Sequence, residues 1–190
     1  MANKNEPFGL RAIGKVGQND ANQGLSEYSV SASSAAIYFQ DPVRAASQGT
    51  IRVAAAGETL IGTLNGIFFT DANTSKPTFA NNLKASNTAT DIVAFVADDP
   101  YERFEIQTDI STASAQTDVF MNADIVVSAG VAANFVSNSM LDDNTLSTVS
   151  GQLKIIGPST NIDNSTVGAG YLNWVVMINE HIYNSATAGI

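Results

Sequence analysis

Short apolar runs, separated every few residues by Asn, Ser, Thr, Gly or Ala, make up most of this 190-residue sequence. Several of these runs alternate apolar and polar residues with the two-residue period of a β-strand. Residues 118–127 are the clearest case, with apolar side chains at every second position. Helical periodicity is scarce and would allow a turn or two at most over residues 139–148. The pattern therefore predicts an all-β fold, either a β-sandwich or a small barrel of jelly-roll type.

The expected strands cover residues 28–30, 36–39, 50–53, 58–70, 92–97, 101–107, 118–127, 152–157 and 171–183. Residues 71–90 are rich in Asn, Thr, Ser and Ala and predict an exposed loop. Gly62 and Gly66 share the apolar face of the 58–70 run, which predicts a bulge, a bend or a close backbone approach there. The expected core consists of Leu60, Leu64, Phe68, Val93, Phe95, Phe104, Ile106, Val119, Ile125, Ile155, Trp174, Val176 and Ile178.

The composition fits one ordinary globular domain, with 44% hydrophobic residues and a mean hydropathy of +0.03. The sequence contains no cysteine, which excludes disulfides and thiol chemistry. No run of apolar residues is long enough for a membrane-spanning helix, so we expect no membrane partner. Residues 1–7 are polar and do not resemble a secretory signal, so synthesis in a cytoplasm is expected.

Charge divides the sequence into two unequal parts. The net charge of −9 disfavours binding to nucleic acid, whose phosphates attract basic surfaces. Residues 1–53 hold five basic and four acidic residues, a net of +1, whereas residues 54–190 hold four basic and fourteen acidic residues, a net of −10. Residues 1–26 show neither strand nor helix periodicity. We therefore expect an extended N-terminal arm over residues 1–26 and a β-rich body over residues 27–190.

Little in the sequence suggests catalysis, because it contains one histidine and no cysteine. The stretch Gly9–Val16 imitates a phosphate-binding loop, but Val16 stands where Ser or Thr must follow the lysine. Residues 142–144 and 161–165 resemble halves of calcium loops, but Leu172 occupies the position of the essential glutamate. A pair of carboxylates could act on glycosides, but nothing favours that arrangement. We expect no enzyme activity, no catalytic residue, no cofactor and no metal.

The last strand candidate presents a mixed face opposite its apolar one. This face is too apolar for a free surface and too polar for a core. We therefore expect it to contact another subunit, either a second copy of this protein or a subunit of a larger shell, and we expect self-association as a trimer first and a dimer second. The residues expected at this interface are Tyr171, Asn173, Val175, Met177, His181 and Tyr183.

Three stretches together resemble a family of small structural proteins from tailed bacteriophages. They are Pro7-Phe8-Gly9-Leu10-Arg11, the run from Ala97 to Gln107 that contains Asp98-Asp99-Pro100-Tyr101, and Val176-Met177-Ile178-Asn179-Glu180-His181. Asn122-Ala123-Asp124 and Leu141-Asp142 fall at fitting intervals between them. The resemblance runs over most of the sequence. One departure is Ala12, where the family pattern leads us to expect proline, and this weakens any inference about a rigid arm.

The resemblance implies a virion protein that decorates or cements the outside of a capsid, with the major capsid protein as partner and the capsid surface as location. The N-terminal arm would then be the main contact, because a segment without a period of its own gains order by docking on a partner. The contact residues expected in the arm are Lys4, Phe8, Leu10, Arg11, Ile13 and Lys15. The alternative is a carbohydrate-binding or other structural component of a phage tail, which would favour exposed tryptophan and tyrosine.

Overall fold

The computed structural model describes residues 3–17, 24–31, 34–110, 113–128, 130 and 133–184, and this part of the chain is nearly all β. Its strands are β1 (Arg11–Lys15), β2 (Ser26–Val30), β3 (Pro42–Ala46), β4 (Thr50–Val53), β5 (Gly62–Thr70), β6 (Pro77–Ala80), β7 (Val93–Ala97), β8 (Glu102–Gln107), β9 (Asn122–Ala123), β10 (Ile125–Val126), β11 (Met140–Leu141), β12 (Leu153–Pro158) and β13 (Asn173–Ile178). Short 3-10 turns lie at Ser47–Gly49, Gln116–Asp118 and Asp143–Thr145. Nothing within these ranges forms a helix of the length and apolarity that a membrane span needs. The expected all-β class is confirmed.

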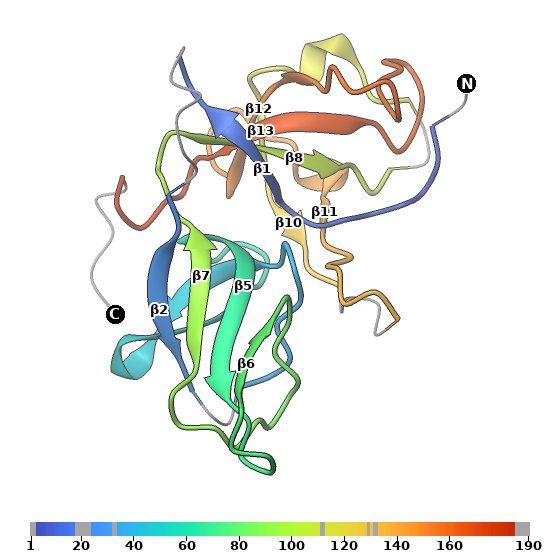
Figure 1. The fold of residues 1–190 in the computed structure, drawn as a ribbon. Coiled ribbons are helices and arrows are strands. Elements are labelled where there is room, and N and C mark those ends of the chain that lie inside the picture. Colours follow the sequence, from blue (N-terminus) through green and yellow to red (C-terminus); the bar gives the residue numbers. More distant parts are fainter. Residues whose placement is uncertain are drawn as a thin grey trace.

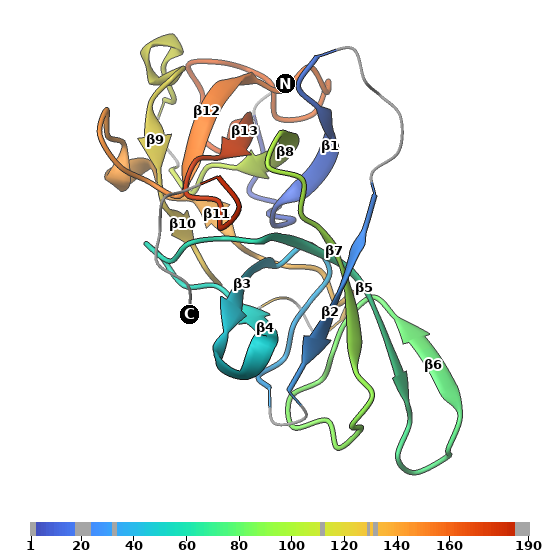
Figure 2. The ribbon, with the colours of Figure 1, turned by 90° about the vertical axis from the view of Figure 1, so that its left-hand side faces the viewer.

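The strands form two lobes, which Figure 1 shows one above the other. The upper lobe holds a five-stranded sheet in the order β1-β8-β13-β12-β9, beside the small β10-β11 ladder. In the lower lobe, β3, β4, β2, β7 and β5 close into a barrel because β5 pairs back onto β3. Strand β6 pairs only with the far half of β5, so the β5–β6 hairpin extends away from the upper lobe (Figure 2).

Each lobe has its own apolar core. The upper core is built around Trp174 and Phe104, and the barrel core around Leu64, Ile67 and Val96. The sequence predicted burial correctly for Leu60, Leu64, Phe104, Ile106, Ile125, Ile155, Trp174, Val176 and Ile178. It was wrong for Phe68, Val93, Phe95 and Val119, which are only half-buried.

A β-bulge in β5 explains the error at Phe68. The pairing of β5 with β7 shifts register between Leu64 and Gly66. One extra residue reverses the alternation of a strand, because successive side chains point to opposite faces. Beyond the bulge, Ile67 therefore points into the barrel, and Phe68 points outward with its cross-strand neighbour Val93. The prediction for the two glycines is thus confirmed, by the bulge at Gly66 and by the close approach of the Ala97 backbone to Gly62.

The lobes are joined by segments that leave one core and enter the other. The loop between β4 and β5 places Ala54 and Leu60 in the upper core, although both flanking strands belong to the barrel. Buried Gln152 holds this loop in place. Its Nε2 donates to the Ala55 and Glu58 carbonyls at 2.9 and 2.7 Å, and its Oε1 accepts from the Ile125 N–H at 3.0 Å. A fully hydrogen-bonded amide of this kind fixes the junction between the lobes.

The N-terminal segment belongs to the upper lobe. Residues 3–17 are extended, as expected, but they lie against the body and do not form a separate arm before residue 27. Strand β1 pairs antiparallel with β8 along the edge of the sheet, and Leu10 is fully buried in the upper core. The segment therefore buries Leu10 and pairs the backbone of β1 within its own chain. The parts of the expected arm at residues 1–2 and 18–23 lie outside the described residues.

Candidate interaction surfaces

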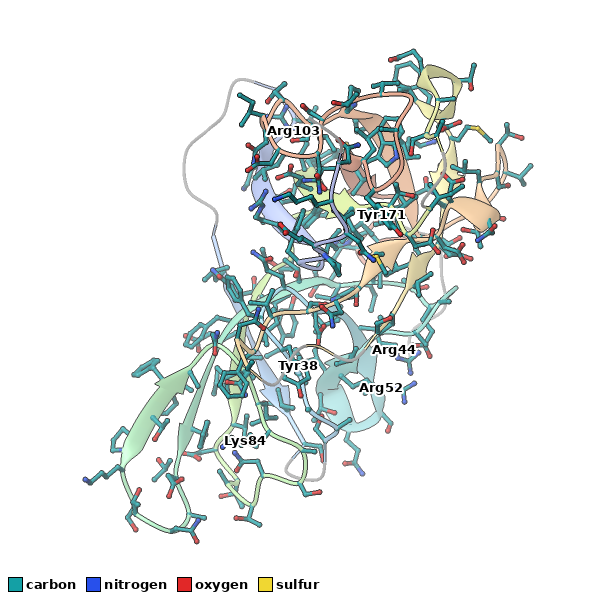
Figure 3. The ribbon with its side chains drawn as sticks, turned by 90° about the vertical axis from the view of Figure 1, so that its right-hand side faces the viewer. Tyr38, Arg44, Arg52, Lys84, Arg103 and Tyr171 are labelled. Atoms are coloured by element: carbon teal, nitrogen blue, oxygen red, sulfur yellow. The ribbon has the colours of Figure 1, made fainter. Side chains whose placement is uncertain are left out.

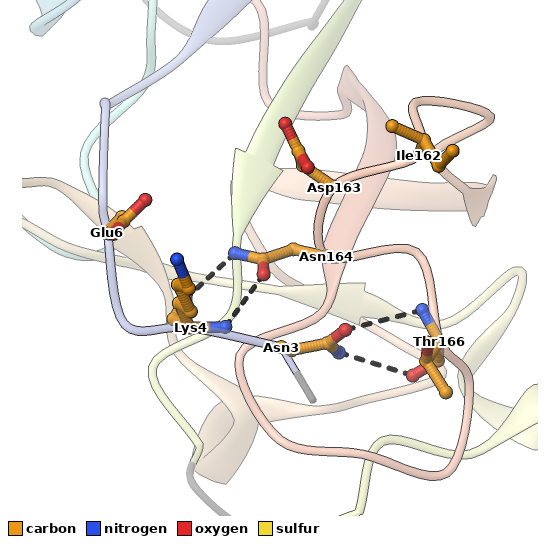
Figure 4. Close-up of a pocket in the computed structure, with 7 residues that line it drawn as sticks. All are labelled: Asn3, Lys4, Glu6, Ile162, Asp163, Asn164 and Thr166. Atoms are coloured by element: carbon orange, nitrogen blue, oxygen red, sulfur yellow. Dashed lines mark hydrogen bonds between the residues drawn. The ribbon is translucent and has the colours of Figure 1, made fainter. Parts of the chain in front are cut away.

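Side-chain amides hold residues 3–6 against the upper lobe in place of a strand ladder (Figure 4). Asn164 accepts from the Lys4 N–H at 2.7 Å and donates to the Lys4 carbonyl at 2.8 Å. Asn3 exchanges a similar pair of bonds with the backbone of Thr166, at 3.2 and 3.4 Å. Buried Gln107 donates to the Lys4 carbonyl and accepts from the Glu6 N–H, both at 3.0 Å. Each of these amides donates one hydrogen bond to the backbone and accepts one from it.

A pocket of about 260 Å³ lies along this contact. Its lining residues are Asn3, Lys4, Glu6, Ile162, Asp163, Asn164 and Thr166 (Figure 4). Lys4 and Glu6 stand on the N-terminal side and Asp163 stands opposite them. Both asparagines of the pocket are occupied by the backbone bonds described above. The pocket is a by-product of the docking of residues 3–6.

The basic residues predicted to contact a capsid are mostly used within the chain. Arg11 forms an ion pair with Glu105 and lies 4.5 Å from the ring centroid of Phe8. Lys15 pairs with Asp99 at 2.5 Å, and this hydrogen bond raises the pKa of Lys15 and lowers that of Asp99. Ion pairing leaves these cations little net charge to offer an acidic partner.

The apolar members of the predicted contact differ among themselves. Leu10 is fully buried and offers no surface, so the prediction that it contacts a capsid was wrong. Phe8 is half-buried beside Arg11, whereas Ile13 and Lys4 are exposed. Of the six residues predicted to contact a capsid, Ile13 and Lys4 are the ones that are exposed.

The predicted subunit interface on the last strand is also only partly available. Tyr183 is exposed, and Tyr171, Val175 and Met177 are half-buried. His181 and Asn173 are buried within the chain, so the prediction that they face another subunit was wrong. The reason for His181 is that β13 ends at Ile178, so strand alternation no longer applies three residues later. Asn173 is buried because it lies beside Gln107 and Glu105, with Nδ2 3.4 Å from the Glu105 carboxylate.

Another cluster of charged side chains holds the β4–β5 loop in place. Arg44 and Arg52 are cross-strand neighbours on β3 and β4, and both guanidinium groups lie 3.1 Å from Glu58 Oε1 (Figure 3). Glu58 Oε2 accepts from the Ala55 N–H at 2.8 Å, so the cluster closes the β4–β5 loop. Within the described ranges, no three His, Cys, Asp or Glu side chains gather as metal ligands would. Asp142 accepts from the Asn144 N–H at 3.0 Å, as a residue in a polar turn does.

Asp41 is a buried carboxylate at the start of β3. Its Oδ2 accepts from the Tyr38 N–H at 2.8 Å, and the buried Ser137 hydroxyl lies nearby. Burial raises the pKa of Asp41 to about 6, although the Ser137 and Tyr38 contacts partly oppose this. Holding this carboxylate charged at pH 7 therefore costs stability.

We predict that Asp41→Asn removes a pH dependence of stability. Between an unfolded pKa near 3.8 and a folded pKa of about 6, the native protein binds the extra proton, so stability rises as pH falls. When the pH is lowered from 7.5 to 5.0, the free energy of unfolding of the wild type should rise by about 1.4 kcal/mol relative to that of Asp41→Asn. Urea unfolding of both proteins at each pH measures this difference directly. An unchanged difference would mean that Asp41 titrates normally.

An outer aromatic face, consisting of Phe68, Phe79, Val93 and Phe95, covers neighbouring strands of the barrel lobe. Phe68 is paired in register with both Phe79 on β6 and Val93 on β7. The ring centroids of Phe68 and Phe79 lie 4.8 Å apart, and those of Phe79 and Phe95 lie 6.4 Å apart. Phe79 is 75% exposed. An exposed phenylalanine backed by half-buried apolar side chains makes this face a candidate contact surface.

Comparison with known proteins adds no relative: no protein-family model matches the chain, and neither does any curated protein or any solved structure.

Proposed function

We propose that this chain is a structural virion protein that decorates the outside of a tailed-phage capsid and stabilises the shell. The observation that carries the proposal is the outer aromatic face, a group of apolar side chains on the surface of a protein whose described charged clusters serve its own fold. The resemblance of residues 7–11, 97–107 and 176–181 to phage structural proteins supplies the partner, the major capsid protein. In this proposal the protein acts by binding and catalyses no reaction.

The aromatic face is a better candidate for the capsid contact than the N-terminal segment. Leu10 is buried, and the cations of Arg11 and Lys15 are paired with acidic residues of the same chain. Phe79, by contrast, stands on the β5–β6 hairpin, which extends from the barrel lobe (Figure 2). A projecting hairpin can reach a neighbouring surface without any rearrangement of either core.

We further propose self-association, as a trimer first and a dimer second. Tyr171, Val175, Met177 and Tyr183 are the residues of the predicted interface that keep exposed surface. Light scattering on the purified protein tests the association, and counting copies at each capsid symmetry axis tests the geometry. A monomer in solution together with isolated copies on the particle would contradict it.

The rival function is a carbohydrate-binding component of a phage tail. Such sites commonly present tryptophan and tyrosine to the sugar. The one tryptophan of the sequence, Trp174, is 0% exposed. Among the described residues, Tyr101 and Tyr183 are exposed, but the most exposed aromatic side chains are Phe79 and Phe120, which lack a polar group for sugar hydroxyls. These observations favour a protein partner.

Shell binding tests the proposed function, and Phe79→Ser is its sharpest variant. We expect purified protein to bind empty shells assembled from the major capsid protein, and Phe79→Ser to weaken binding about 30-fold, as loss of a central aromatic contact does. Phe120→Ser is the matched control, because Phe120 is 74% exposed against 75% for Phe79 but lies in the upper lobe. Occupancy is measured by co-sedimentation with shells over a range of protein concentrations.

The possible outcomes separate the two parts of the proposal. If the wild type leaves the shells undecorated at every concentration, the decoration function is wrong. If the wild type binds and both variants bind equally well, decoration stands and the aromatic face is not the contact. Weakening by Phe120→Ser alone would move the contact to the upper lobe.

A further inference from the structure

The C-terminal strap, residues 179–184, passes from one core to the other. Ile178, the last residue of β13, is buried in the upper core, and Ile182 packs against the barrel core. Between them the strap forms a parallel bridge to Leu60. The Leu60 N–H donates to the Glu180 carbonyl and the Ile182 N–H donates to the Leu60 carbonyl, both at 2.9 Å. The strap thus ties the two lobes together beside the β4–β5 loop.

His181 lies at the centre of the strap and is 0% exposed. Its Nδ1 accepts a hydrogen bond from the Tyr183 N–H at 3.1 Å. An imidazole nitrogen that accepts a hydrogen bond carries no proton, so the neutral ring must hold its single proton on Nε2. A second proton on Nδ1 would face the Tyr183 N–H directly. The turn from His181 to Tyr183 therefore requires neutral histidine.

Titratable groups from several elements surround this ring. The Tyr183 ring lies 5.4 Å from the imidazole, and its hydroxyl is 2.6 Å from that of Tyr28 on β2. The Tyr28 hydroxyl donates to Asp98 at 2.5 Å in the turn between β7 and β8. Asp98 and Asp99 act on His181 electrostatically, and Lys15 of β1 neutralises Asp99. The strap itself adds Glu180, whose carboxylate accepts from the Gly151 N–H at 3.3 Å.

We propose that the strap is a pH-sensitive latch between the two lobes, held closed by neutral His181 and opened when this side chain is protonated. The inference is independent of the proposed capsid function. Opening would release the Tyr183 N–H from Nδ1 and expose the imidazole to water, where both nitrogens can donate. The Leu60 bridge and the Tyr183–Tyr28 contact lie in the same segment and would loosen with it.

The direction of the His181 pKa shift in the closed strap agrees with opening on protonation. Burial lowers the pKa of His181. Backbone hydrogen-bonding groups of Ile61 and Asp98 and the negative charges of Asp98 and Asp99 oppose that change. A histidine whose pKa is lowered in the closed state stabilises closure above its ordinary pKa near 6.5. This contribution is lost progressively as the pH falls below that value.

Amide exchange measured against pH tests the latch. If only the open strap binds the proton, its opening equilibrium should rise about tenfold between pH 7.5 and pH 5.5. The protection factors of the Leu60, Ile182 and Tyr183 amides, corrected for intrinsic exchange, should fall by the same factor. Protection of the Trp174 amide inside the upper sheet should not change with them. Equal protection of the strap amides at both pH values would overturn the proposal.

Two further measurements attribute the effect to His181. It is the only histidine of the sequence, so its imidazole signals in an NMR spectrum are unambiguous. At pH 7.5 they should show an unprotonated Nδ1, and a protonated Nδ1 there would refute the latch. His181→Asn stays neutral, keeps an acceptor for the Tyr183 N–H because its Oδ1 is attached to Cγ as Nδ1 is, and should remove the tenfold change. Asp41→Asn is the matched control and should keep it, because Asp41 titrates in the same range but lies outside the strap. If His181→Asn does not fold, the wild-type NMR and exchange results decide alone.

Discussion

Replacing Trp174 by alanine should lower the free energy of unfolding by about 3–5 kcal/mol. Trp174 is fully buried in the upper core, in register with Ile106 on one side and Pro158 on the other. Both neighbouring strands are hydrogen-bonded to β13, so the backbone cannot collapse easily into the space that the indole leaves. The loss therefore combines lost apolar burial with an unfilled cavity. Urea unfolding followed by circular dichroism measures it.

Trp174→Phe is the matched control. The indole Nε1 has no hydrogen-bond partner within the part of the chain that the structure describes, so phenylalanine sacrifices no bond there. We expect this variant to lose about 1–2 kcal/mol, well below the alanine variant. A loss near zero for Trp174→Ala would contradict the burial of this side chain. That result would also restore the case for a carbohydrate site built on tryptophan.

The sequence predicted the fold class because strand periodicity is a local property. Alternation in residues 102–107 and 173–178 correctly assigned Phe104, Ile106, Trp174, Val176 and Ile178 to one buried face. It failed where a strand changes its register or ends. The bulge beside Gly66 turned the Phe68 side chain from the inner to the outer face of β5. Strand β13 ends at Ile178, so strand alternation does not determine the direction of the His181 side chain. Neither event changes the composition of the sequence around it.

The candidate surfaces were harder to predict than the core, because they depend on contacts between distant segments. Leu10 is an isolated apolar residue in a polar stretch, yet it is buried among strands that begin about ninety residues later along the sequence. The Leu10 N–H donates to the Gln40 carbonyl at 2.9 Å, a contact that no local period reveals. Likewise β6 lies within residues 71–90, which were expected to form a loop because they are rich in Asn, Thr, Ser and Ala and contain Pro77. The aromatic face could be recognised only after β6 was placed beside β5.

The other large effect is expected from Gly62→Ala at the start of β5. A Cβ atom at this position would lie 2.0 Å from the Ala97 carbonyl oxygen and 2.8 Å from its carbon. These are backbone atoms of β7, so no side chain can rotate away, and the barrel strands would have to separate. Overpacking against a rigid backbone costs about 3 kcal/mol or more. We therefore expect a correspondingly lower urea midpoint.

Gly66→Ala, four residues along the same strand, isolates this steric effect from the general cost of replacing glycine. A Cβ atom there meets the Ala80 carbonyl oxygen at 3.7 Å and the Phe95 ring at 3.8 Å, which are ordinary contacts. Because alanine restricts the unfolded chain more than glycine does, this variant should be neutral or more stable by up to about 1 kcal/mol. Similar losses for the two variants would show that β5 and β7 do not approach as closely at Gly62 as the closed barrel requires. A large loss at Gly62 alone would establish that approach, since both changes add the same methyl group to one strand.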